Sequence, residues 1–254
     1  MLGQRVAGEK ENEITHAADM TRGLDLRGCI VTADDLSTQR GFASALIEAG
    51  ADYCLAVKEN QKGLCEGIQM AFLDVTETRA LKWQGEAVLA HGRIEQRSVR
   101  VLPGSVLGAA QCRKWIGLDE GCIVAAVTDA EDKRTGAGSS QMRLFITSLR
   151  WGVPLIAERA ARAVRRHWSV ENELHHVLDV DFQQDRTQCK NANHPHNRIL
   201  QNKFAAGVLN KLQERESEKP GAEPLSKRRL MSRLCSARAA LDALAEVCRP
   251  SVHA

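Results

Sequence analysis

The sequence contains no hydrophobic stretch long enough to cross a lipid bilayer and no recognisable leader at its start. No apolar run approaches the ~18 residues that a membrane span requires. The first residues, Met1 to His16, are polar and mixed in charge, whereas a signal peptide carries an apolar segment behind a basic end. We therefore expect a cytoplasmic protein without membrane attachment.

The sequence also lacks any Cys-x-x-Cys pair among its eight cysteines. Such pairs are typical of zinc sites and of thiol redox motifs, so neither is indicated. Cys29, Cys54 and Cys122 stand within apolar, strand-like runs. The cysteines are therefore expected to be reduced, buried thiols rather than a disulfide framework.

The net charge is small but unevenly distributed. It is +3 for the 254 residues. Residues 143–254 carry 19 Lys and Arg against 12 Asp and Glu, a net +7, whereas residues 1–142 carry 16 against 20, a net −4. A basic C-terminal half suggests a polyanion such as DNA as partner, although solvated basic helices are also common.

Two buried strands joined by a helix are predicted near the N-terminus. The apolar runs 28–33 and 52–57 are the strands, and Ser37 and Thr38 are suited to cap the helix between them. A further helix is predicted over roughly 62–75. Strand, helix and strand at this spacing form a βαβ unit with parallel strands.

Two charged residues stand at the carboxyl ends of these strands, where ligands of open α/β sheets gather. Asp34 follows the first strand and Lys58 the second. Hard cations such as Mg²⁺ take carboxylate oxygens, so Asp34 is a candidate metal ligand. It is equally suited to cap the following helix, with Asp35 as the fallback if the register shifts by one. Lys58 is a candidate phosphate contact.

Residues 86–149 change in character and are interpreted as a β-rich insertion. Two strands are predicted at 122–128 and 142–147, joined as a hairpin by the polar loop 129–141. Upstream, Arg93 and Arg97 lie on one face of another strand. They are as consistent with tracking a phosphate backbone as with a solvated strand face.

The C-terminal segments are predicted to be mostly helical. They are a long helix over about 155–181, a loop at 189–197, a helix near 198–213, a linker at 214–224 and a small basic helix over roughly 226–247. The chain then has four parts, which are part of the core (1–82), the insertion (83–150), the completion of the core with an acidic helix (151–213), and the linker with a basic helix (214–254).

A carboxylate interrupts the apolar side of the long helix. Positions 157, 161, 164, 168, 171, 175 and 178 fall on one line and hold Ala, Ala, Val, Trp, Glu, His and Leu. An unpaired buried Glu171 is costly, so it needs a metal, a cation or a cleft. An ion pair with Arg165 or Arg166 explains the stripe about as well. Zinc bound by His167, Glu171 and His175 fits poorly, because the spacing is not His-Glu-x-x-His.

Several short motifs stand one after another along the chain. Around the long helix they are Arg165, His167, Trp168, Glu171, Asn172, Leu174, His175, Leu178, Asp179, Val180, Phe182 and Asp185. Upstream they include Leu24 to Leu26, Gly28 to Thr32, Asp34, Asp52, Tyr53, Lys58, Asn60, Gln61 and His91 to Glu95. In this order they resemble the bacterial insertion-sequence transposases that include the H-repeat-associated proteins, over nearly all of the chain up to about residue 215.

The resemblance implies a DDE transposase with an α/β fold, which is an RNase H-like core with a β-rich insertion and a helical C-terminal tail. Three acids would bind two Mg²⁺ (or Mn²⁺) ions where water, and then a DNA 3′-hydroxyl, attack phosphodiester bonds. By position, Asp34 would be the second acid and Glu171 the third. The expected partner is double-stranded DNA, both transposon ends and target, in a bacterial cytoplasm at the nucleoid. The expected DNA contacts are Lys58, Arg93, Arg97, Arg165, His167, Trp168, Asn172 and His175.

The first acid of such a site has no counterpart in this sequence. In the family it lies on the first core strand, followed by Gly-Lys, whereas Asp19 and Asp25 have no such setting. We therefore expect a truncated, inactive copy that lacks the first core strands and leaves the strand at 28–33 with an unpaired edge. The sequence also has His176 where the family has Trp and Gln184 where it has Glu, and neither change removes a ligand.

Two other functions fit the same residues. A non-catalytic remnant would bind DNA ends, or pair with itself or with a full-length transposase and inhibit it. A salt-dependent shift of end DNA without cleavage would support that function. A generic metal-dependent hydrolase would instead act on small phosphoesters without DNA.

Overall fold

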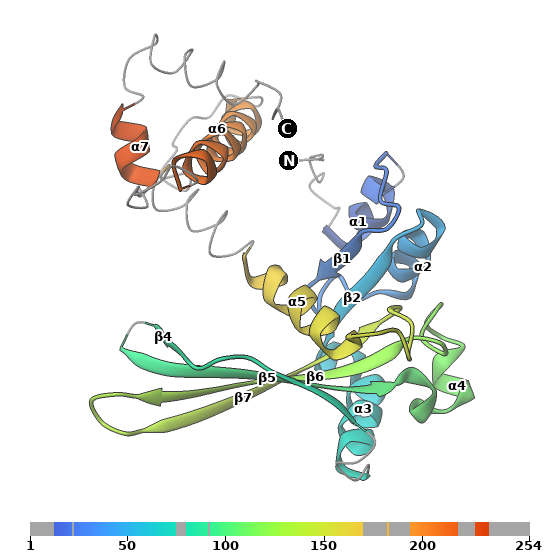
Figure 1. Ribbon diagram of the computed structural model, residues 1–254. Coiled ribbons are helices and arrows are strands. Elements are labelled where there is room, and N and C mark those ends of the chain that lie inside the picture. The colour runs from blue at the N-terminus through green and yellow to red at the C-terminus, as the bar shows by residue number, and fades with distance from the viewer. Residues whose placement is uncertain are drawn as a thin grey trace. The chain divides into compact units, whose positions relative to one another are not determined.

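The computed structural model describes residues 13–21, 23–74, 80–90, 92–169, 182, 194–217 and 227–233. They belong to two compact units, one within residues 7–168 and one that contains residues 169–254 (Figure 1). The predicted division into four parts stays a prediction.

The first unit is built on a seven-stranded mixed sheet (Figure 1). Six strands follow the order β1-β2-β7-β6-β5-β3, and β4 pairs with β5. The strands are β1 (Ile30–Ala33), β2 (Asp52–Val57), β3 (Leu81–Gln84), β4 (Val88–Ala90), β5 (Arg93–Pro103), β6 (Cys122–Asp132) and β7 (Gly138–Thr147).

The predicted βαβ unit is confirmed. β1 and β2 are parallel, with Ile30 opposite Asp52, and the helix α2 (Arg40–Glu48) connects them. β7 then pairs antiparallel with β2. The strands of the predicted β-rich segment, β7, β6, β5 and β3, extend the sheet that β1 and β2 begin. The fold class is mixed α/β with a mostly antiparallel central sheet.

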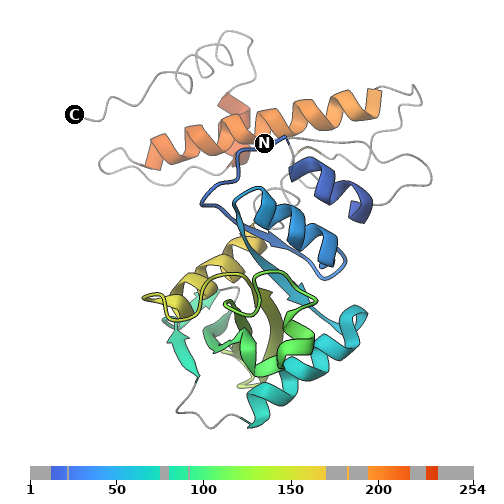
Figure 2. The same cartoon turned by 90° about the vertical axis from the view of Figure 1, so that its right-hand side faces the viewer.

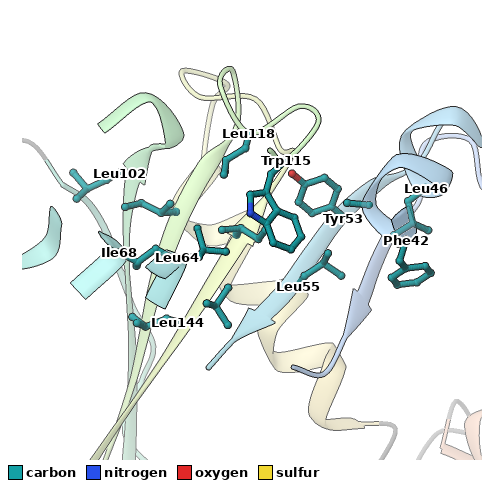
Figure 3. Packing of buried hydrophobic residues seen from close by; sticks show 14 of the residues in the cluster. Phe42, Leu46, Tyr53, Leu55, Leu64, Ile68, Leu102, Trp115, Leu118 and Leu144 are labelled. Atoms are coloured by element: carbon teal, nitrogen blue, oxygen red, sulfur yellow. The ribbon is translucent and has the colours of Figure 1, made fainter. Parts of the chain in front are cut away.

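Helices cover both faces of this sheet. α1 (Glu13–Thr21), α2 and α3 (Lys62–Asp74) contribute to the core on one face, and α5 (Ile156–Ser169) packs on the other. Side chains alternate between the faces along β2, so Tyr53 and Leu55 belong to the first core and Cys54 to the second. Figure 3 shows the first core, where Tyr53 and Trp115 lie beside Leu55.

The helix α3 buries the apolar side that its sequence predicted. Leu64, Ile68 and Phe72 recur every four residues and are buried, whereas Met70 and Leu73 are exposed. The 3-10 turn η1 (Glu59–Gln61) leads into it from β2.

Small residues bring α5 close to the sheet. Ala157, Ala160, Ala161 and Val164 are buried against strand residues such as Val99. The first three members of the predicted stripe are thus confirmed as buried. The side chain of residue 168, and residues 171, 175 and 178 entirely, lie outside the described residues.

β5, β6 and β7 continue beyond the covering helices as a long ribbon (Figure 1). The predicted hairpin is confirmed, since β6 pairs antiparallel with β7, but the predicted loop at 129–141 is too long, because β6 runs to Asp132 and β7 begins at Gly138. Polar residues pair along both strands, for instance Asp129 with Ser140. Both faces of the ribbon are exposed to solvent, so its strands can consist of polar residues. The polar run therefore does not mark the end of either strand.

A compact turn closes the ribbon. One carboxylate oxygen of Asp132 accepts the backbone N–H groups of Arg134 and Thr135, each at 2.9 Å. These bonds lower the pKa of Asp132, the largest cause being the bond from Thr135. Gly136 has φ +70°, a conformation that glycine adopts without strain.

Between β5 and β6 the chain makes the 3-10 turn η2 (Gly104–Leu107) and the short helix α4 (Ala109–Cys112). Gly104 approaches the backbone of Leu118 so closely that a Cβ there would lie 1.9 Å from the Leu118 carbonyl oxygen. Glycine is therefore required at this crossing of two loops.

The second unit contains α6 (His194–Ser217) and α7 (Lys227–Arg233). Figure 2 shows α6 along its length. The small core of this unit consists of Leu209, Leu212 and Leu230, with Phe182, Val208 and Met231 against it. The predicted loop at 189–197 and linker at 214–224 are wrong where they overlap α6, which starts and ends within them.

The described cysteines form no disulfide, and Cys54, Cys112 and Cys122 are buried as predicted. Burial, and to a lesser degree the neighbouring Cys122, raises the pKa of Cys54 to about 12. Cys29 departs from the prediction, because β1 begins after it and leaves it exposed.

Candidate functional site

The candidate site lies at the carboxyl ends of β1 and β2, which are neighbours in the sheet. Asp34 follows β1 directly and is exposed. Its Oδ1 accepts the backbone N–H of Ser37 at 3.0 Å, and its Oδ2 has no hydrogen-bond partner among the described residues. This bond closes a turn before α2, whose N-cap is Gln39. The predicted capping of α2 by Ser37 or Thr38 is wrong, because no side chain caps that helix.

Asp35 differs from Asp34 in its electrostatic setting. The Lys58 Nζ lies 2.6 Å from Asp35 Oδ1, and the Asp35 side chain is 21% exposed against 65% for Lys58. The hydrogen bond from Lys58 is the main reason why the pKa of Asp35 lies below its ordinary value. Asp35 therefore already has a cation, whereas Asp34 keeps an open carboxylate oxygen.

Polar side chains connect the two loops that follow β1 and β2. The Thr38 hydroxyl lies 2.9 Å from the carbonyl oxygen of Asp34 and 2.6 Å from that of Ala56, and it can donate to one of them at a time. Asn60 donates from Nδ2 to the carbonyl of Asp35, and Gln61 from Nε2 to the carbonyl of Thr38 at 3.1 Å.

The predicted phosphate contacts of β5 lie on the ribbon. Arg93 and Arg97 alternate in step with Val99, which faces α5, so both arginines lie on the α5 side of the sheet. Arg97 forms an ion pair with Glu95. The carboxylate of Glu95 thus partly balances this cation.

Sequence reasoning missed a third arginine on this side, Arg143. It alternates in step with Phe145, which belongs to the core under α5. The register pairs Val57 with Leu144, so the next positions along these strands are Lys58 and Arg143. Alternation within the predicted strand at 142–147 was the signal that could have identified it.

The helix α5 adds exposed basic residues. Arg165, which was predicted, and Arg159 and Arg162, which were not, are exposed on this helix, and His167 is half-buried. Arg162 pairs with Glu158 at 2.8 Å. Trp168 belongs to α5, whereas Glu171, Asn172 and His175 lie outside the described residues.

The donor chemistry of Asp34 suits a hard divalent cation, because a carboxylate oxygen is open at an exposed strand end. One carboxylate is a small part of a metal site. Within the described segments no three His, Cys, Asp or Glu residues come together as a group that could hold a metal ion. The proposed partner, Glu171, lies beyond these segments.

Among the residues that the structure describes, no helix combines the length and apolar character that bilayer crossing requires.

Known proteins share this sequence along most of its length. Residues 1–207 match the family described as Transposase DDE domain. The chain is 30% identical over 197 residues to the H repeat-associated putative transposase YhhI of Escherichia coli K12. These residues cover 76% of this chain and 50% of that protein. It is 30% identical over 197 residues to the putative transposase YncI of Escherichia coli O157:H7, covering 76% of this chain and 48% of that protein.

A protein encoded in the dhlA 3′ region of Xanthobacter autotrophicus is 34% identical over 149 residues, which cover 58% of this chain and 48% of that protein. The chain thus spans about half the length of these relatives. The family match covers well over half of the chain and confirms the resemblance stated above. The chain belongs to the family of transposase DDE domains.

Proposed function

We propose that this chain contributes two acids, Asp34 and Glu171, to the metal site of a DDE transposase that cleaves and joins DNA at transposon ends. The observation that carries the proposal is the open carboxylate of Asp34 at the carboxyl ends of two parallel strands, in a chain of this family. Ligands of α/β sheets bind at such ends.

A divalent ion, Mg²⁺ or Mn²⁺, supplies charge neutralisation at the phosphodiester and activation of the attacking hydroxyl when bound. Asp34 offers its Oδ2 as a ligand while the Ser37 amide holds Oδ1. Asp35 stays paired with Lys58 and takes no part. Because no residue of this sequence matches the first acid of the family, the chain by itself is proposed to be inactive in cleavage.

The DNA partner is proposed to lie on the α5 side of the sheet. Arg93, Arg97 and Arg143 of the ribbon and Arg165 of α5 share that side, and arginine forks match phosphate oxygens. Lys58 lies at the strand end next to Arg143. His167, Trp168, Asn172 and His175 are proposed to extend the contact beyond Arg165. No membrane contact is proposed for these residues.

The two-acid proposal is tested with Mn²⁺ as a paramagnetic probe of the isotope-labelled full chain. One bound ion should broaden the backbone amide signals of both residue 34 and residue 171. Asp34→Asn and Glu171→Gln should each abolish the broadening at both positions. Broadening at one position alone, or no effect of either substitution, would contradict a shared ion.

A second candidate is a non-catalytic DNA-binding protein that pairs with a second copy or with a full-length transposase. The feature that favours it is β1, which in the described part of the chain pairs with β2 only. An open strand edge can accept a strand from another chain. Co-purification of this chain with a tagged full-length transposase, together with slower strand transfer, would support it, and two independently eluting proteins would exclude it.

A further inference from the structure

The loops after β1 and β2 are tied together more extensively than a simple βαβ crossing requires. Three side chains after β2, those of Lys58, Asn60 and Gln61, each reach the segment after β1. Lys58 binds the Asp35 carboxylate, Asn60 the backbone carbonyl of Asp35, and Gln61 the backbone carbonyl of Thr38. In return, the Thr38 hydroxyl approaches the carbonyl of Ala56 on β2.

Thr38 is the centre of this network. Its side chain is fully buried, although threonine is a polar residue at the exposed end of a sheet. Its hydroxyl is within reach of the carbonyl of Asp34, which follows β1, and of the carbonyl of Ala56, which lies near the end of the neighbouring strand β2. Gln61 holds the carbonyl of the same residue. Thr38 is thus fixed at both its side chain and its backbone.

The network acts on Asp34 through the turn between them. The Ser37 amide, which holds Asp34 Oδ1, belongs to the residue just before Thr38. The Thr38 amide also donates to the carbonyl of Asp35 at 3.2 Å, and Asn60 binds that same carbonyl. The carboxylate of Asp34 is therefore oriented by a turn whose other positions are bound to β2 and η1.

We infer that Thr38, Asn60 and Gln61 are positioning residues that hold the Asp34 carboxylate in the orientation for binding a divalent ion. This role rests on the proposed function of Asp34. None of the three touches the ion; they act by fixing the turn from Asp34 to Thr38. Their amide and hydroxyl groups carry no charge, so the fixation adds no counter-charge to the site.

The test combines amide hydrogen exchange with the Mn²⁺ titration, on the full chain. In Thr38→Val and in Gln61→Ala, the Ser37 amide should exchange roughly three- to tenfold faster, the factor expected for loss of one hydrogen bond. Thr38→Ser, which keeps the hydroxyl, should restore the wild-type rate. Both loosened variants should need a higher Mn²⁺ concentration to broaden the residue 34 signal.

Glu59→Gln is the matched control, because Glu59 lies in the same turn between Lys58 and Asn60 and has no hydrogen bond to the Asp34 segment. It should leave the exchange rate of the Ser37 amide unchanged. Thermal unfolding of each variant shows whether the fold survives, and Gln61→Ala, at a half-buried position, keeps the test valid if Thr38→Val at a fully buried one unfolds.

Unchanged Ser37 exchange in both variants would overturn the positioning role and leave the proposed function intact. Faster exchange with an unchanged Mn²⁺ response would also overturn the role, because orientation would then not matter for the ion. Absence of broadening in the wild-type protein is a different result, since it would overturn the proposed function itself and the role with it.

Discussion

At the scale of single residues, neighbouring side chains of the same type have different chemistry. Asp34 and Asp35 are adjacent carboxylates, yet Lys58 is paired with one and the other keeps an open oxygen. The sequence predicted that an acid would stand at the end of the first strand. It could not predict which of the two is open, because that depends on Lys58, a contact across 23 residues.

Asp132 at the tip of the ribbon offers a pH-dependent prediction. Its folded-state pKa is lowered, so the turn is stabilised above the ordinary Asp pKa of about 3.9 and loses that stabilisation as the pH falls through the lower folded value. The Thr135 amide signal should therefore titrate with a midpoint below about 3.9 in an NMR pH series. Asp132→Asn keeps an acceptor without a titrating group and should show no such transition. A wild-type midpoint at or above the ordinary value would contradict the capped turn.

Gly104 offers a prediction about close packing. Gly104→Ala places a Cβ against the Leu118 carbonyl and should lower the free energy of unfolding by at least about 1–3 kcal/mol, as overpacking does. Gly63→Ala is the control, because a Cβ there meets no atom within 4 Å. Urea unfolding of both variants checks the difference. Equal stabilities would mean that the two loops separate without cost.

At the scale of elements, periodicity predicted helices and strands where an element has one buried side. α3 and β2 were predicted closely because their apolar residues follow the periods of a helix and of a buried strand. The ribbon and the ends of α6 were not. In the ribbon and at the ends of α6, the element continues through polar residues that are exposed to solvent. The amino-acid composition of such a segment is the same as that of a loop, so it does not show that the strand or helix continues.

Ile68 tests the buried side of α3. Ile68→Ala should lower the free energy of unfolding by about 2–5 kcal/mol, because Ile68 is 0% exposed and the change leaves a cavity. Met70 lies two residues further along the same helix and is 57% exposed, so Met70→Ala should change the free energy of unfolding by less than about 0.5 kcal/mol. Chemical denaturation with circular dichroism measures both. Similar losses would show that α3 packs on a different side.

At the scale of the whole molecule, charge is divided between the two sides of the sheet. The α5 side carries Arg93, Arg97, Arg143 and the exposed arginines of α5, together with the acids Glu95 and Asp132, while Asp129 and Glu131 of the ribbon lie on the other side by alternation. The sequence suggested a basic half of the chain. The structure shows instead a basic side, since the arginines come from segments before and after the middle of the chain.

DNA binding tests this division. Arg93→Gln combined with Arg143→Gln should reduce the slope of log binding constant against log salt concentration by roughly 2, since each lost phosphate contact removes about 0.9. Lys62→Gln combined with Lys114→Gln removes the same charge from α3 and from the loop after α4, which belong to the other side, and should leave the slope unchanged. Fluorescence anisotropy with end DNA measures both slopes. Equal reductions would indicate attraction by net charge without a defined binding side.

The pairing of β7 with β2 has a consequence for any attempt to shorten this chain. Residues 83–150 cannot be excised as a removable accessory, because β7 satisfies the backbone hydrogen bonds along one side of β2. Without it, β2 would present bare amides and carbonyls between Cys54 and Val57. A minimal version of the protein therefore has to keep that strand, or supply another in its place, even if it discards the outer part of the ribbon.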